Sequence, residues 1–159
     1  MKIFIKSVLL LMVGVISGCQ FDPYAGDLTT EQPRREDVIG DYRFEKQTIS
    51  QANIDTLGQK ATITLRPDGT YQANNIPNVF DGADGQSHKY ISAIGTWKIE
   101  TIGSTGNGWG HPKPHWGIVL TAIDESLTSI GFMGDHKPYK LIVTFDDPDL
   151  GKVMTFSKS

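Results

Sequence analysis

The stretch Ala61-Thr62-Ile63-Thr64-Leu65-Arg66-Pro67-Asp68-Gly69-Thr70-Tyr71-Gln72-Ala73 decides the fold class of this chain. In its first half, apolar residues alternate with threonines, which is the period of a strand with one buried face. Proline then sets the first corner of a turn, and glycine takes the left-handed position. The second half returns with strand-forming residues, so residues 60–75 are predicted to form a β-hairpin.

Further strands are predicted on both sides of this hairpin. Their expected ranges are Asp41–Thr48, Tyr90–Ile102, Trp116–Ile123, Leu127–Met133, Tyr139–Phe145 and Lys152–Ser157. The stretch from Ile49 to Leu57 is the one helical candidate, and a loop between strands is its alternative. Eight strands joined by short turns predict an all-β, antiparallel up-and-down barrel, because closure leaves no exposed edge. A β-sandwich is the alternative fold.

Two motifs resemble the start of bacterial lipocalin-like domains, which open with a Gly-x-Trp or Gly-x-Tyr strand and carry a D-G-T-Y hairpin. They are Ile39-Gly40-Asp41-Tyr42-Arg43-Phe44 and Leu65-Arg66-Pro67-Asp68-Gly69-Thr70-Tyr71. Ile94-Gly95-Thr96-Trp97 and Asp147-Pro148-Asp149-Leu150-Gly151 are also similar to parts of small barrel lipoproteins. The resemblance implies a lipocalin-like barrel, but not a ligand, since one fold serves many functions.

The first nineteen residues have the pattern of a secretory signal peptide. Met1 to Lys6 carry two lysines, and Val8 to Ile16 form an apolar run that is too short to span a bilayer, which takes about 20 residues. Ile16-Ser17-Gly18-Cys19 resembles the lipobox of bacterial lipoproteins. The resemblance implies transfer of diacylglycerol to the Cys19 sulfur, cleavage after Gly18 and acylation of the new amino group.

One alternative to a lipoprotein signal remains at this stage, a plain signal peptide with a chance cysteine. A soluble core helix is excluded, because no polar residues mark an outer face. Cys19 is the only cysteine, and an unpaired cysteine in a small secreted domain needs an explanation that acylation supplies. Gln20 follows, where the lipoprotein family uses aspartate for inner-membrane retention. The resemblance therefore implies an outer-membrane anchor with the domain facing the periplasm.

These patterns divide the chain into three parts. Residues 1–18 are the expected signal peptide, and residues 19–37 the expected lipidated N-terminus with a flexible tether. The tether is rich in proline, threonine and charge and has no strand or helix period. Within it, Phe21 and Tyr24 are expected either at the lipid interface or packed on the domain. Residues 38–159 are the expected β-rich domain.

Charge limits the possible partners. Removal of Lys2 and Lys6 from 15 basic residues leaves 13 against 18 acidic residues, a net charge of −5. No basic stripe remains for phosphate contacts, which argues against nucleic acid. Attraction to anionic lipid is equally unsupported, so Cys19 is the expected route to the membrane.

The candidate ligand-binding loop is Trp109, His111, His115 and Trp116, in the stretch His111-Pro112-Lys113-Pro114-His115. Two imidazoles could bind a metal, and the tryptophans could stack on a sugar or an apolar ligand. We favour the alternative, a long hairpin loop with aromatic anchors, and expect no cofactor. The sequence contains no Gly-x-Ser-x-Gly motif, phosphate loop or spare thiol, so no enzymatic activity is expected.

Three functions remain open. The first is a lipocalin-like carrier, because an eight-stranded barrel is wide enough for one small apolar ligand. The second is a structural or protein-interaction lipoprotein with a filled barrel. The third is a weak metal or glycan binder through residues 109–116. We prefer the second, because Trp116–Ile123 is apolar on both faces.

Overall fold

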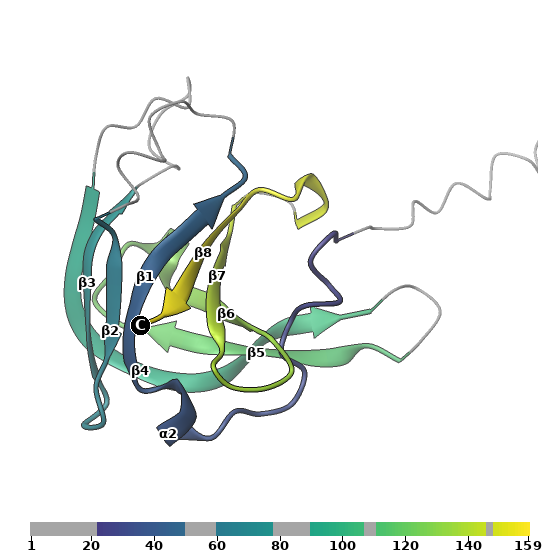
Figure 1. Ribbon diagram of the computed structural model, residues 1–159, viewed down its shortest axis with the longest axis horizontal. Coiled ribbons are helices and arrows are strands. Elements are labelled where there is room, and N and C mark those ends of the chain that lie inside the picture. The colour runs from purple at the N-terminus through teal and green to yellow at the C-terminus, as the bar shows by residue number, and fades with distance from the viewer. Residues whose placement is uncertain (1–21, 50–59, 78–89, 107–110, 146–147) are drawn as a thin grey trace, which may run out of the picture.

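The protein folds as a closed barrel of eight strands in sequence order, each antiparallel to the next, with the last pairing with the first (Figure 1). This computed structural model describes residues 22–49, 60–77, 90–106, 111–145 and 148–159. The strands are β1 (Gly40–Gln47), β2 (Thr62–Leu65), β3 (Thr70–Pro77), β4 (Tyr90–Thr105), β5 (Lys113–Leu120), β6 (Ser129–Met133), β7 (Lys140–Thr144) and β8 (Val153–Lys158). The predicted all-β, up-and-down barrel is confirmed, and the sandwich alternative is wrong.

The hairpin that decided the fold class forms as predicted. Leu65 pairs with Tyr71 across β2 and β3. Gly69 has a φ of +88°, in the left-handed region that favours glycine. The Asp68 carboxylate accepts hydrogen bonds from the backbone N–H and the hydroxyl of Thr70, at 2.9 and 2.7 Å. Local turn chemistry alone therefore places this hairpin.

Three of the six strands outside that hairpin differ from their predicted ranges by two residues or more. β4 continues to Thr105 and β5 begins at Lys113, so the β4–β5 hairpin is longer than expected at its open end. Leu127 lies in a 3-10 turn, η2 (Glu125–Leu127), ahead of β6. The predicted helix from Ile49 to Leu57 lies outside the described residues except for its first residue.

Inward-facing side chains of the described strands pack together in the barrel interior. Every strand contributes alternate, inward-facing residues to one apolar cluster, which includes Tyr42, Ile63, Leu65, Tyr71, Ala73, Trp97, Ile118, Leu120, Ile130, Phe132, Leu141, Val143, Met154 and Phe156. The rings of Phe44 and Phe156 meet edge to face, with centroids 6.3 Å apart, at the seam where β8 pairs with β1. Large aromatic side chains, among them Tyr42, Tyr71, Phe132 and Phe156, are thus part of the interior packing.

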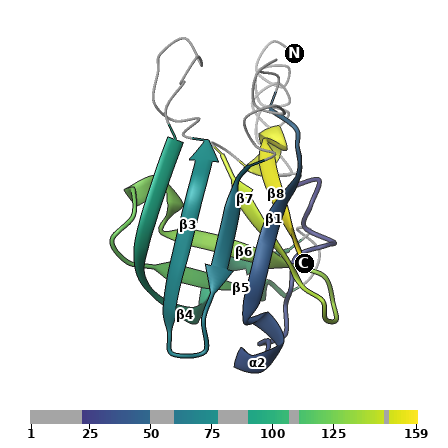
Figure 2. The same ribbon diagram turned by 60° about the vertical axis from the view of Figure 1, so that its left-hand side comes forward.

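A single helical turn, α2 (Arg35–Val38), covers one end of the barrel (Figure 2). Val38 is fully buried, and its carbonyl accepts a 2.7 Å hydrogen bond from the hydroxyl of Tyr42. The Arg35 guanidinium lies 4.2 Å from the centre of the Trp97 ring, a cation–π contact. These contacts hold the turn against the core.

Residues 22–30, which we call the strap, lie along the outside of the barrel, within the range 19–37 where a flexible tether is expected. Leu28 forms an antiparallel bridge with Met133. Thr29 donates its N–H to the Phe132 carbonyl at 3.1 Å and accepts from the N–H of Trp116 at 3.0 Å. This docking uses backbone groups, which a side-chain period does not reveal.

The strap also buries apolar surface. Leu28 packs with Ile142 and Val153, outward-facing residues of β7 and β8, and Tyr24 and Met133 border this second cluster. Leu28 is 7% exposed. Tyr24 thus packs on the domain, one of the two expected positions. Among the described helices, none is long and apolar enough to cross a membrane.

Candidate functional site

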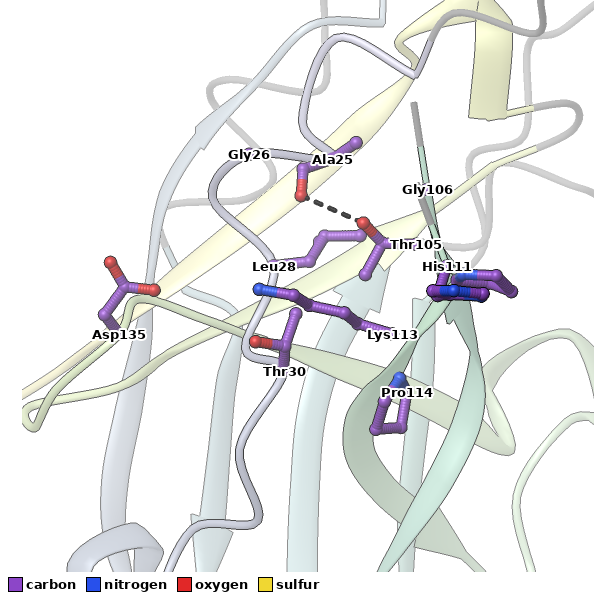
Figure 3. Close-up of a pocket in the computed structure, with 11 residues that line it drawn as sticks. Ala25, Gly26, Leu28, Thr30, Thr105, Gly106, His111, Lys113, Pro114 and Asp135 are labelled. Carbon is purple, nitrogen blue, oxygen red and sulfur yellow. Dashed lines mark hydrogen bonds between the residues drawn. The ribbon is translucent and has the colours of Figure 1, made fainter. Parts of the chain in front are cut away.

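A groove of about 620 Å³ lies on the outside of the barrel, between the strap and the β4–β5 hairpin (Figure 3). We call it the strap groove. Its lining comes from three segments: Ala25, Gly26, Leu28 and Thr30 of the strap; Thr105, Gly106, His111, Pro112, Lys113 and Pro114 of the hairpin; and Asp135 of the turn after β6. The groove therefore joins parts of the chain that are far apart in sequence.

The groove exists because β5 diverges from β6. Those two strands pair only from Gly117–Gly131 to Val119–Ser129. β5 and β4, in contrast, stay paired as far as Lys113 and Thr105. The hairpin therefore projects beyond the barrel wall as a two-stranded ribbon. The strap enters the gap and bonds to β5 on one side and to β6 on the other.

The side chains of the groove provide an apolar floor and a charged rim. Leu28 is nearly buried, whereas the rim residues His111, Lys113 and Asp135 are exposed. In Figure 3 the Lys113 side chain reaches from the hairpin toward the strap, with Asp135 on the opposite side. The Thr105 hydroxyl donates a 3.3 Å hydrogen bond to the Ala25 carbonyl and ties the two walls together. Such a surface fits an extended, amphipathic segment better than a single charged ligand.

The structure separates the three described residues of the predicted binding loop, His111, His115 and Trp116. His111 lines the strap groove, and Trp116 packs inward against the core cluster. His115 lies instead against Gly131 of β6, where a Cβ atom would be only 2.6 Å from its ring. Trp109 lies outside the described residues, as does Cys19. Among the described members of the predicted set, His111 is the one that lines the groove.

His115 sits in an unusual environment for an imidazole. Its Nε2 atom is buried and has no hydrogen-bond partner. Burial lowers the pKa of the ring, and the Phe132 carbonyl and the charge of Asp22 oppose that shift in part. The ring is therefore packed against β6, in surroundings that favour its neutral form. In the part of the chain that is described, no three His, Cys, Asp or Glu residues gather as metal ligands.

Sequence reasoning missed the strap, Lys113 and Asp135 as parts of one site. One signal for the strap was present in the strands that it covers. β7 is apolar at Leu141, Ile142 and Val143 in succession, so one of its apolar residues must point out of the barrel. β8 repeats this pattern at Val153 and Met154. Two outward apolar residues on adjacent strands indicate a covering segment, although not which one.

Comparison with models of protein families, with curated proteins and with solved structures finds no match for this chain.

Proposed function

We propose that this protein is a non-enzymatic lipoprotein of the bacterial envelope, anchored through lipid on Cys19, which binds a partner protein in the strap groove. The observation that carries the proposal is the position of the cavities that described residues line. Three cavities lined by described residues are on the outer surface, whereas inward side chains of all eight strands pack into one core. A barrel of this kind binds its partners on its outer surface.

The anchor is supported by the lipobox resemblance at Ile16-Ser17-Gly18-Cys19, and Gln20 supports an outer-membrane location facing the periplasm. Diacylation with an added amide-linked chain supplies more than the two lipid signals that stable anchoring requires. A carrier would need open space in the barrel. A metal site would need a second ligand beside His111, and His115 points elsewhere. Neither alternative has a specific observation in its favour.

The partner that fits the groove is an extended peptide segment. The strap already shows that extended backbone binds at this place, through hydrogen bonds to Phe132 and Trp116. The mixed charges of Lys113 and Asp135 favour a partner carrying both signs, and the apolar floor favours one anchoring side chain. We expect a membrane-proximal segment of another envelope protein.

A site-specific photocrosslinker tests this proposal in the living bacterium. It replaces Lys113 in the groove or, as a matched control, Lys98 on the outer face of β4, whose side chain is 61% exposed. The position-113 probe should trap one discrete envelope protein, and the position-98 probe should not. Identical products from both positions, or none from position 113, would contradict a partner site in the groove.

The same experiment in a Cys19→Ser background tests the anchor. The thiol that accepts lipid is then absent, so the protein should leave the membrane fraction and the crosslink at position 113 should weaken. Persistent membrane attachment would show that lipid on Cys19 is not the anchor.

A further inference from the structure

The strap begins beside an exposed apolar side chain. Leu150, the last residue of η3 (Pro148–Leu150), is 60% exposed. The next residue, Gly151, touches the strap, because a Cβ atom there would lie 3.0 Å from Cγ of Pro23. On the other flank, Thr105 bonds to Ala25. The strap thus starts between η3 and the open end of the β4–β5 hairpin, as Figure 1 shows.

The chain between this point and the proposed anchor is short. Cys19 is three residues before Asp22, so their α-carbons are at most about 11 Å apart, given about 3.6 Å per extended residue. Asp22 is itself held in a turn. Its carboxylate accepts the N–H of Tyr24 at 2.8 Å, and its carbonyl accepts the N–H of Ala25 at 3.1 Å. The lipid-bearing residue is therefore confined to one side of the barrel.

That distance is comparable with the depth of a lipid headgroup layer. Each polar layer of a bilayer is about 5–8 Å thick, and acyl chains on Cys19 begin at its inner boundary. We propose that the side of the barrel bearing Pro23, Pro112 and Leu150, the bilayer face, rests in the lipid headgroups, with Leu150 inserted. This inference rests on the lipid anchor proposed above and adds an orientation to it.

The chemistry of the bilayer face agrees with a neutral lipid surface. Its exposed prolines carry no charge and no backbone donor, and Leu150 gains by leaving water. Nearby charges have both signs, because Lys113 and Asp135 both line the strap groove. Anionic lipid is therefore not required. The opposite wall offers a matched control in Ile94 of β4, which is 68% exposed.

Spin labels test this orientation. Leu150→Cys and Ile94→Cys variants of the full chain are purified from bacterial membranes, labelled, and reconstituted in phosphatidylcholine–phosphatidylethanolamine vesicles. Collisions of each label with oxygen, which concentrates in lipid, are compared with collisions with a water-soluble nickel chelate. The oxygen-to-nickel ratio at position 150 should be several-fold higher than at position 94. Pro23→Cys repeats the measurement from the strap if Leu150→Cys does not fold.

Three outcomes would overturn the inference, and they are distinguishable. If intact mass shows no lipid on Cys19, the anchor itself fails. If the lipid is present but positions 150 and 94 give the same ratio, the anchor stands and the orientation fails. If the label at position 150 shows spin–spin broadening, and the broadening is as strong in detergent micelles as in vesicles, a second copy of the chain covers Leu150 instead of lipid.

Discussion

Two neighbouring strands come very close together at Gly117, where β5 meets β6. A Cβ atom at this position would be 2.4 Å from the Ile130 carbonyl oxygen and 2.7 Å from Cδ1 of Ile102. The first of these is a backbone atom, so it cannot rotate away. We therefore expect Gly117→Ala to lower the free energy of unfolding by about 1–3 kcal/mol, as overpacking does. Urea denaturation measures the change.

Gly103 is the matched control for this substitution. It lies on the same ribbon, in β4, and a Cβ atom there would meet no atom within 4 Å. Gly103→Ala should change the free energy of unfolding by no more than about 0.5 kcal/mol, the range of ordinary surface substitutions. An equal loss in both variants would refute the steric explanation.

The burial of His115 predicts a pH dependence of stability. Its pKa in the folded protein is lowered, mainly by desolvation, so the unfolded chain binds a proton more readily than the native one. The stability from this residue is therefore complete above about pH 6.5, the ordinary value, and is lost as the pH falls toward the lowered pKa. Urea midpoints at pH 7.5 and 5.0 measure this loss.

His115→Gln removes the titrating group, so it should reduce the fall in midpoint between the two pH values. The matched variant, His111→Gln, changes an exposed histidine on the same hairpin and should leave that fall unchanged. If the two variants behave alike, burial of His115 is not the source of the pH dependence.

Part of the predicted hairpin loop forms the beginning of β5, and the cause is simple. Two prolines in His111-Pro112-Lys113-Pro114-His115 favoured a loop, yet β5 begins at Lys113 and includes Pro114. Proline is tolerated at the edge of a sheet, where its missing N–H removes no ladder bond. Strand alternation then sends His115 outward and Trp116 inward, so the sequence could name these residues but not which would share a surface.

Among the elements, the strap is the one whose stability can be tested separately from the barrel. Leu28 anchors it against Ile142 and Val153, and Leu28→Ala removes most of that apolar contact. Hydrogen exchange should then accelerate at the amides of Thr29 and Trp116, which the docked strap protects by hydrogen bonding. Exchange measured residue by residue detects this local opening.

Leu28→Met keeps nearly the same volume and serves as the control, with little change in exchange. Amides of the β2–β3 hairpin should keep their protection in both variants, because they lie outside the strap contacts. Uniform acceleration over the whole barrel would instead mean that the strap and the barrel open together.

The hairpin and the strap show what a sequence pattern can and cannot predict. β2 and β3 were predictable because their pairing partners are joined by one short turn with its own residue chemistry. The strap pairs with Phe132 and Trp116, roughly a hundred residues away, through backbone groups that every residue carries. The composition of the strap is typical of a flexible spacer. Only the outward-facing apolar residues on β7 and β8 indicated that a segment packs there.

At the scale of the whole molecule, the barrel closes where β1 pairs with β8, the two strands farthest apart in the sequence. β1 and β8 come together over more than a hundred residues, with Phe44 opposite Phe156 and Gln47 opposite Met154. Closure was predicted because a meander with free edges would be exposed to aggregation, and not from any motif for this pair. Fold class was thus predictable, whereas the groove depends on where β5 and β6 diverge.

Phe156 tests how far the barrel depends on this seam. It is fully buried, and its ring meets that of Phe44. Phe156→Ala should cost about 3–5 kcal/mol of unfolding free energy, because it leaves a cavity among side chains from several strands. The midpoints from tryptophan fluorescence and from far-ultraviolet circular dichroism should fall together, since one core that all eight strands share unfolds as one cooperative unit.

Ile94→Ala is the matched control, because it truncates an apolar side chain that is 68% exposed on the opposite wall. Its effect should stay within about 0.5 kcal/mol. If Phe156→Ala separates the two midpoints, the seam opens before the rest of the barrel. The β4–β5 ribbon and the strap groove would then belong to a unit that survives without closure, and partner binding at Lys113 should persist in the open form.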